Sequence, residues 1–276
     1  MYTSTDLTGR AVVVTGAGSG IGRELALLCA VRGADLALCD VNEEGLAATA
    51  AEARSIGRTV VTQCVDVSDS TQVREFAAKT EAEYGAVDLV ANNAGIGVLG
   101  GFLDTTEADW DRLLSINLMG VVHGCRAFLP AMIASGKRGH IVNIASAAGL
   151  LANPDLGAYS ATKFAVVGLS EALRVELAPH GIGVTAVCPG LINTAIARNT
   201  ELRGEGNDEA RRDKVAALYE KRGYTPERVA RNILKAVARN KAVAPIALEA
   251  HLMYAASRFT PSLARWAAGR MAAVGK

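Results

Sequence analysis

The sequence lacks the features that mark several classes of protein. Its formal net charge is only +1 over 276 residues, so the chain as a whole has no electrostatic preference for nucleic acid. Its five cysteines lie scattered in apolar surroundings, without CxxC or Cys/His spacing. This pattern favours buried, reduced thiols in a cytoplasmic protein, and it predicts no metal site.

Long apolar segments are also missing. No apolar run approaches the roughly 20 residues that a membrane-spanning helix needs. The first ten residues, MYTSTDLTGR, lack the apolar core of a secretory signal. We therefore expect a cytoplasmic protein. With 50% hydrophobic residues, the chain can bury a large core.

Apolar, β-branched runs alternate along the chain with longer helical patterns. The predicted strands are 10–15, 34–40, 59–65, 87–92, 140–146 and 183–189, and the predicted helices lie near 20–32, 43–56, 69–83, 107–135 and 157–179. Such alternation indicates a parallel sheet with helices on both faces. We predict an α/β fold, a doubly wound parallel sheet of the Rossmann type. It forms a single domain over 1–245 and carries a C-terminal helical extension over 246–276.

A glycine-rich turn connects the first predicted strand to its helix. Gly16, Gly20 and Gly22 have the spacing G-x-x-x-G-x-G, which differs from the common G-x-G-x-x-G. A turn of this kind brings backbone N–H groups of a helix N-terminus close to a bound pyrophosphate. Asp40 ends the next strand, where a carboxylate accepts hydrogen bonds from the adenosine ribose. The alternatives are plain turn chemistry for the glycines and for Asp40.

A second set of polar residues points to proton transfer. Tyr159 and Lys163 lie four residues apart at the start of a predicted helix and therefore share a face, and Ser146 precedes Tyr159 by 13 residues. A tyrosine has an ordinary pKa near ~10, and a neighbouring ammonium stabilises its phenolate, so Tyr159 becomes a usable general base. Ser146 can hold a substrate oxygen. The alternative is a surface pair on an amphipathic helix.

Six motifs occur in order: T-G-x-x-x-G-I-G at 15–22, N-N-A-G at 92–95, Asn117, Ser146, Y-x-x-x-K at 159–163, and Pro189-Gly190. With them, the chain resembles a classical short-chain dehydrogenase/reductase over about residues 8–245. The resemblance implies an oxidoreductase that interconverts a secondary alcohol and a ketone, with Tyr159 as general acid and base. It also implies that Lys163 holds the nicotinamide ribose and that Asn117 supports a chain of waters.

The resemblance further implies a set of cofactor contacts. The expected set is Gly16, Ser19, Gly20, Ile21, Gly22, Asp40, Asp66, Val67, Asn93, Gly95, Tyr159, Lys163, Pro189 and Thr194. Asp66 and Val67 match the family's adenine-binding pair, although Asp66 alone could be a turn former. Relatives that use NADP usually carry Arg or Lys at the positions of Ser19 or Val41. Both residues here are uncharged, which together with Asp40 favours NAD over NADP.

The segment 191–224 is predicted to be a lid over the substrate. It combines apolar residues with many charged ones, whereas a disordered surface loop is the alternative. Apolar residues also follow the N-N-A-G motif and precede Tyr159. No cluster of Arg or Lys offers a site for a substrate carboxylate or phosphate. We therefore expect a lipophilic secondary alcohol or ketone as the small-molecule substrate.

The C-terminal segment 257–276 has four basic residues and no acidic one. It predicts a helix that packs on another subunit or lies on an anionic membrane. Family members are generally dimers or tetramers built through the helices predicted at 107–135 and 157–179, so we expect a homodimer or homotetramer. Two rival functions stay open: an NADP-linked 3-ketoacyl-thioester reductase, and a non-catalytic NAD(H)-binding sensor or scaffold.

Overall fold

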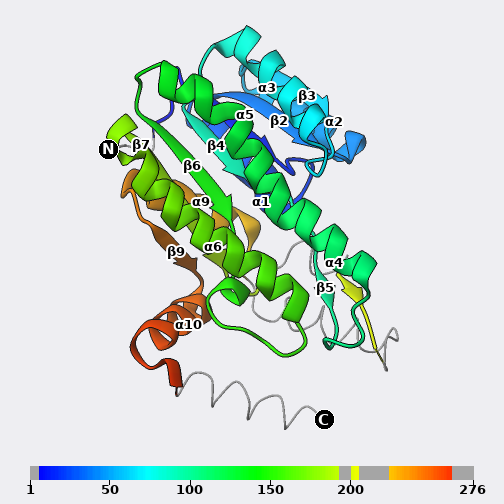
Figure 1. Cartoon of the computed structure of the whole chain (residues 1–276). Helices are drawn as coiled ribbons and strands as arrows, with labels where there is room; N and C mark the ends of the chain where they lie inside the picture. Colours follow the sequence, from blue (N-terminus) through cyan, green and yellow to red (C-terminus); the bar gives the residue numbers. More distant parts are fainter. Residues whose placement is uncertain (1–5, 193–199, 205–223, 263–276) are drawn as a thin grey trace.

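The computed structural model describes residues 6–192, 200–204 and 224–262. A seven-stranded parallel sheet runs through its centre in the order β3-β2-β1-β4-β6-β7-β9 (Figure 1). Its strands are β1 (Ala11–Thr15), β2 (Asp35–Asp40), β3 (Val60–Cys64), β4 (Leu89–Asn92), β6 (Gly139–Ile144), β7 (Ile182–Pro189) and β9 (Val243–Ile246). The predicted doubly wound parallel sheet is confirmed.

Helices cover both faces of this sheet. One face packs against α1 (Gly20–Val31), α2 (Glu43–Ser55) and α9 (Pro226–Ala238), and the other against α3 (Ser70–Tyr84), α5 (Gly120–Ala134) and α6 (Gly157–Leu177). Side chains alternate between the faces along each strand, so Val12 and Val14 enter the first core and Val13 enters the second. The strands therefore read as continuous apolar runs.

The strand order reverses between β1 and β4. From β1 the chain continues through β2 to β3 on one side and then returns to β4 on the other side of β1. In open α/β sheets, ligands bind at the carboxyl ends of the strands at such a point. The fold therefore brings the glycine-rich turn after β1 next to the N-N-A-G motif at the end of β4.

One helix and one strand near the edge of the sheet were not predicted from the sequence. The helix α9 begins after Thr225 with Pro226 at its first position, and the edge strand β9 follows it. The proposed division between residues 245 and 246 falls inside β9, so the segment assigned to the tail supplies the last residue of the sheet. Pro245 is tolerated there because an edge strand does not need all its N–H donors.

The predicted helix 107–135 is divided into three parts. These are α4 (Glu107–Leu113), a π-helical turn η1 (Leu114–Met119) and α5. By length and composition alone, the continuous stretch Glu107–Ala134 could cross a membrane, contrary to the expectation from the sequence. In the fold it is a core helix, because Phe128 and Met132 are buried against the sheet.

Smaller elements lie outside the seven-stranded sheet. They are β5 (Val98–Leu99) and β8 (Glu201–Leu202), which pair in parallel, the 3-10 turns η2 (Ala147–Gly149) and η3 (Ala178–His180), and α10 (Leu248–Phe259). All five cysteines are free thiols. Four of them are buried as expected, but Cys64 is exposed. Among the described residues, no group of three or more His, Cys, Asp or Glu could hold a metal ion.

Candidate active site

The glycine-rich turn packs directly against the end of β4. Gly16 has φ +65°, and a Cβ on it would lie 2.8 Å from Ala94 Cα. A Cβ on Gly22 would meet the carbonyl oxygen of Gly16. Only glycine fits both positions, because the backbone passes too close for any side chain. The spacing G-x-x-x-G-x-G therefore follows from how closely the turn and the start of α1 approach β4.

Side chains from both strands hold this turn in place. Thr15 Oγ1 accepts hydrogen bonds of 3.0 Å from the backbone N–H groups of Asn93 and of Ala94. Asn93 Nδ2 donates to the carbonyls of Thr15 (2.9 Å) and Gly16 (3.1 Å). Thr49, which the sequence analysis missed, is buried in α2 and donates to the Ala17 carbonyl at 2.9 Å. The turn is thus preorganised by polar contacts from three elements.

The N-terminus of α1 has no side-chain cap within the part of the chain that the structure describes. Among the described residues, Ser19 makes no side-chain hydrogen bond to the backbone N–H groups at the start of α1, in contrast to the capping residues of α2, α3 and α4. The described N-termini of α6 and α9 also lack such a bond. The first N–H groups of a helix need acceptors. At α1 they are placed to bind an anion such as a pyrophosphate, on the stretch that contains Gly20 and Ile21.

Asp40 stands at the carboxyl end of β2, beside this turn. Its Oδ2 accepts a hydrogen bond of 2.8 Å from the Gly18 N–H, and its Oδ1 accepts one of 2.9 Å from the Asn42 N–H. Each carboxylate oxygen has a second lone pair for a further donor. The half-buried Asp40 carboxylate is therefore fixed beside the glycine-rich turn, and its remaining lone pairs can accept hydrogen bonds from ribose hydroxyls. Ser19 in this turn and Val41 after Asp40 are both exposed and uncharged.

The pair after β3 has a structural role of its own. Asp66 Oδ1 accepts hydrogen bonds from both the backbone N–H and the hydroxyl of Ser68, at 2.9 and 2.7 Å. Asp66 therefore forms a turn, which was the alternative reading. The Val67 side chain is buried in the core, so only the backbone of Val67 can contact an adenine ring. Their adenine contacts stay a prediction.

Asn117 lies in the π-helical turn η1 and is fully buried. Its Oδ1 accepts the Ile96 N–H at 2.9 Å, and its Nδ2 donates to the Ile96 carbonyl at 3.0 Å. A π-turn redirects side chains within a helix and often occurs at functional sites. Here it aims Asn117 at the chain just after the N-N-A-G motif. The role of Asn117 in a chain of waters stays a prediction.

Lys163 is the most buried charged group of the site. Only 4% of it is exposed, and burial lowers its pKa from 10.5 to about 8. Its Nζ donates to the Ile144 carbonyl at 3.1 Å and lies 5.6 Å from the centre of the Tyr159 ring. A Cβ on Gly95 would lie 3.0 Å from Asn117 Oδ1 and 3.5 Å from Lys163 Nζ. Gly95 thus leaves space between the buried amide and the buried ammonium.

Ser146 and Tyr159 are both half-buried, unlike Lys163 and Asn117. Ser146 follows β6, and its Oγ accepts the Ala148 N–H at 3.1 Å, which caps η2. Residue 149 in η2 packs against the Lys163 backbone, so the short turn carrying Ser146 is seated on α6. Ser146 and Tyr159 are therefore partly accessible to solvent, whereas Asn117 and Lys163 are buried.

The structure also describes the turn after β7. Pro189 is buried at the end of the strand, and Gly190 and Leu191 lead away from it. Thr194 and most of the predicted lid, 193–199 and 205–223, lie outside the described residues. Three residues near this edge were missed from the sequence: Asp109, Arg203 and Glu249. Each makes contacts far along the chain, and no local pattern signals them.

These residues fit a dinucleotide. At Gly16 and Gly22 in the turn after β1 there is no space for a side chain, and among the described residues the N-terminus of α1 has no side-chain cap. The Asp40 carboxylate lies beside this turn at the end of β2. This arrangement can bind a pyrophosphate and an adenosine ribose. The half-buried Tyr159 has its ring 5.6 Å from the buried Lys163 Nζ, and Ser146 after β6 is also half-buried; these residue types can move a proton at a substrate oxygen.

Comparison with known proteins agrees with this geometry. A family model described as short chain dehydrogenase matches residues 10–204. The probable oxidoreductase EphD of Mycobacterium tuberculosis is 43% identical over 258 residues, 92% of this chain and 44% of that protein. The chain therefore spans less than half the length of EphD.

Two further similarities cover nearly the whole of the chain. The putative oxidoreductase SadH of Mycobacterium tuberculosis is 43% identical over 246 residues, 88% of this chain and 87% of SadH. A crystal structure of a short-chain dehydrogenase/reductase from Burkholderia phymatum in complex with NAD has a TM-score of 0.80 at 33% identity. The match covers 94% of this chain and 93% of the Burkholderia phymatum chain.

Proposed function

The chain belongs to the short-chain dehydrogenase/reductase family, whose members are oxidoreductases that use a nicotinamide dinucleotide, and on that premise we propose that it interconverts a secondary alcohol and a ketone with NAD(H). One observation carries the proposal: the buried Lys163 ammonium lies beneath the ring of the half-buried Tyr159. An ammonium in this position favours the phenolate and makes the tyrosine an effective acid and base.

In this proposal the protein moves the proton. During oxidation Tyr159 Oη takes the proton from the substrate hydroxyl, and during reduction it returns a proton to the forming alkoxide. Ser146 donates a hydrogen bond to the same substrate oxygen and orients it. The bound nicotinamide supplies or accepts the hydride. Asn117 keeps the chain at Ile96 in place beside these groups.

The proposal names NAD rather than NADP as the coenzyme. Asp40 is held by two backbone N–H groups and presents a carboxylate where a 2′-phosphate would lie, so charge repulsion opposes NADP. Ser19 and Val41 bring no positive charge to offset this repulsion. The related Burkholderia structure in complex with NAD is consistent with the assignment.

We propose a lipophilic substrate. Ile96, Leu99, Leu151 and Leu156 are half-buried around the edge that carries Ser146 and Tyr159. The guanidinium of Arg203 near this edge is bound to Asp109 and Glu201 rather than presented to a ligand. Apolar side chains of this kind favour a hydrocarbon skeleton around the reacting carbon.

The experiment follows the absorbance of reduced nicotinamide with a panel of apolar alcohols, sugars and hydroxy acids. The expected result is turnover of apolar secondary alcohols with NAD. Tyr159→Phe removes the proton-transfer group, so it should abolish turnover while NADH binding stays nearly unchanged. Rapid turnover of a sugar or hydroxy acid, with none on apolar alcohols, would contradict the substrate class. Turnover of 3-ketoacyl thioesters with NADPH would favour the alternative of an NADP-linked reductase. NADH binding without any turnover would favour the alternative of a non-catalytic sensor or scaffold.

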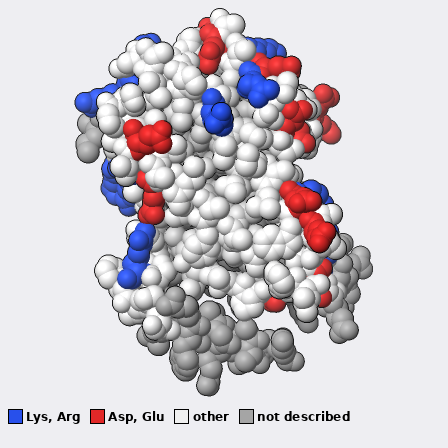
Figure 2. All heavy atoms as spheres, viewed as in Figure 1, with Lys and Arg blue, Asp and Glu red and all other residues white. Residues whose placement is uncertain are grey.

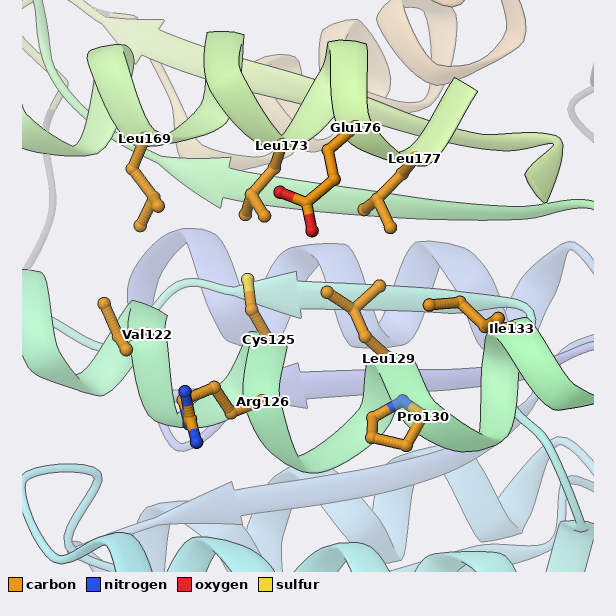
Figure 3. Close-up of a pocket in the computed structure, with 10 residues that line it drawn as sticks. All are labelled: Val122, Cys125, Arg126, Leu129, Pro130, Ile133, Leu169, Leu173, Glu176 and Leu177. Carbon is orange, nitrogen blue, oxygen red and sulfur yellow. The ribbon is translucent and has the colours of Figure 1, made fainter. Parts of the chain in front are cut away.

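We also propose that the protein is a homodimer or homotetramer formed through α5 and α6. Figure 3 shows a groove between these helices, with Leu169, Leu173 and Leu177 of α6 facing Val122, Leu129 and Ile133 of α5. Figure 2, viewed from the same side as Figure 1, shows few charged residues over the middle of this face. A second copy would cover the groove. Leu173→Lys should then dissociate the assembly in analytical ultracentrifugation.

The C-terminal helix supports a further proposal about assembly. Leu248, Leu252 and Phe259 of α10 are 73%, 62% and 85% exposed, and the tail 263–276 lies outside the described residues. We propose that this end packs on a neighbouring subunit, with anionic membrane binding as the rival. A protein truncated after residue 260 with unchanged assembly and liposome binding would defeat both.

The free thiols are consistent with our proposal of a cytoplasmic location.

A further inference from the structure

An ion pair between a half-buried arginine and a buried carboxylate joins two segments that are 94 residues apart. Arg203 Nε donates to Asp109 Oδ2 at 2.9 Å, and Arg203 Nη2 donates to Asp109 Oδ1 at 2.7 Å. The Asp109 side chain is only 3% exposed, and the guanidinium holds the pKa of this carboxyl well below its usual range. Two parallel hydrogen bonds between planar groups fix orientation as well as distance. The pair therefore sets where residue 203 lies relative to α4.

The ion pair stands at the end of a very short strand pairing. β8 pairs with β5 through two residues on each strand, with bonds from Glu201 N to Gly97 O (3.2 Å) and from Arg203 N to Leu99 O (2.8 Å). A pairing of this length is not stable by itself. Figure 1 shows the short yellow strand beside β5, next to α4. Arg203 thus fastens β8 to the same helix against which β5 packs.

β5 in turn borders the proton-transfer group. Val98 is buried in a small cluster with Leu113 and Ala158, and Tyr159 and Trp110 pack against this cluster. Just before β5, Ile96 is bound by Asn117 on both its N–H and its carbonyl. The strand is therefore held on one side by the amide of η1 and on the other by the pairing that Arg203 secures.

We propose that Arg203 and Asp109 are positioning residues that hold β5 and β8 together as one wall of the substrate pocket beside Tyr159. This inference rests on the proposed function, because it concerns how that site selects among alcohols. Removing Arg203 leaves the Asp109 carboxylate buried without its cation, so we expect the wall to shift rather than relax in place. The wall then discriminates less well between short and long substrates.

A matched surface pair provides the control. Arg112 Nη2 lies 2.7 Å from Glu201 Oε1, but 47% of the Arg112 side chain and 38% of the Glu201 side chain are exposed. Exposed ion pairs contribute little because water screens them. Arg112→Met therefore removes a guanidinium that contacts the same strand without opening a buried site. Asp109→Asn keeps an oxygen for the capping contacts with Thr106 and loses the charge.

The experiment compares wild type, Arg203→Met, Arg203→Lys, Asp109→Asn and Arg112→Met on 2-alkanols from 2-butanol to 2-decanol with NAD. Arg203→Met and Asp109→Asn should raise the KM by about tenfold or more while kcat changes much less, since the proton-transfer groups are untouched. Their preference for one chain length should flatten. Arg203→Lys should restore part of the KM, and Arg112→Met should match wild type. NADH affinity should be the same in all five proteins.

Amide hydrogen exchange supplies a readout that does not depend on turnover. Arg203→Met should lose protection at the backbone amides of residues 201 and 203 and keep it in β1, β4 and β6. Unchanged protection there, or an unchanged KM and chain-length preference, overturns the inference. An equal loss of NADH affinity also overturns it, because the pair would then support the whole site. If wild type oxidises none of the alcohols, the proposed function itself fails. If wild type is active and the variants have the same KM and chain-length preference as wild type, the inference alone fails.

Discussion

The Glu249 side chain accepts a hydrogen bond of 2.9 Å from the backbone N–H of Leu191, 58 residues earlier in the chain. Leu191 lies two residues beyond the end of β7, and Glu249 lies in the first turn of α10. A Cβ on the intervening Gly190 would strike the Glu249 carboxylate. The C-terminal helix is therefore part of the support for the turn that leaves the sheet next to the site.

Replacing Glu249 should weaken catalysis without removing a reacting group. Glu249→Ala leaves the Leu191 N–H without this acceptor, and hydrogen bonds to charged groups contribute roughly 1.5–3 kcal/mol. We expect kcat/KM to fall about tenfold and the free energy of unfolding to fall by about 1–3 kcal/mol. Glu249→Gln keeps an oxygen acceptor and should retain most of both. Steady-state kinetics and denaturant unfolding measure the two effects; an unaltered kcat/KM for Glu249→Ala would show that α10 does not support the site.

Coenzyme preference should follow the charge at the end of β2. Asp40→Ala together with Val41→Arg removes the carboxylate and adds a guanidinium for a 2′-phosphate. The ratio of kcat/KM for NAD to that for NADP should fall by about tenfold or more, since a single charged hydrogen bond is worth roughly 1.5–3 kcal/mol. Val41→Arg alone is the control, because it leaves Asp40 and its two backbone contacts in place. Equal use of both coenzymes by the unmodified protein would contradict the role of Asp40.

Lys163 should cost stability while it supports turnover. Burial lowers its pKa from 10.5 to about 8, so at neutral pH the folded protein holds an ammonium in a poorly solvated place. Lys163→Met should unfold at a higher temperature than wild type at pH 7, by the equivalent of about 1–3 kcal/mol, and should lose turnover. Differential scanning calorimetry and the nicotinamide assay measure the two changes.

The pH dependence gives a second check on Lys163. Between pH 8 and 10.5 the unfolded chain holds a proton at this residue that the folded chain has lost, so this group makes wild-type stability rise with pH in that window. The variant should lack this contribution. A variant that is less stable than wild type at pH 7 would mean that the hydrogen bond to Ile144 outweighs the burial of the charge.

Acid should destabilise the protein through His140. Burial lowers the pKa of this histidine from 6.5 to about 3, and its Nε2 lies 2.8 Å from Thr185 Oγ1. Since the unfolded chain takes up the proton first, the stabilisation from neutral His140 is complete above pH 6.5 and is lost as the pH falls toward 3. His140→Gln should show a shallower loss of unfolding free energy between pH 6.5 and 4 than wild type. His180→Gln, at an exposed site, is the control and should match wild type. If the unfolding free energy of wild type and of both variants fell equally between pH 6.5 and 4, His140 would not be the source of the acid sensitivity.

The order of strands and helices was determined by the sequence itself. Continuous apolar runs and helical periodicity are local patterns, so the six predicted strands agree with the structure to within one or two residues. The glycine spacing, the position of Asp40 at a strand end and the four-residue separation of Tyr159 and Lys163 are local as well. A helix places residues four apart on one face wherever it lies, so this pair could be read before the fold was known.

Only the tertiary structure decided what surrounds these residues. β8 has only two residues, and β9 contains Pro245, a residue that argues against a strand. The π-turn that aims Asn117 at Ile96 interrupts a pattern that predicts one continuous helix. The contacts Arg203–Asp109 and Glu249–Leu191 join residues 94 and 58 positions apart. Such contacts depend on how packed elements meet in space. Local sequence describes each element alone, and the partner of a side chain is determined only when the sheet has brought the elements together.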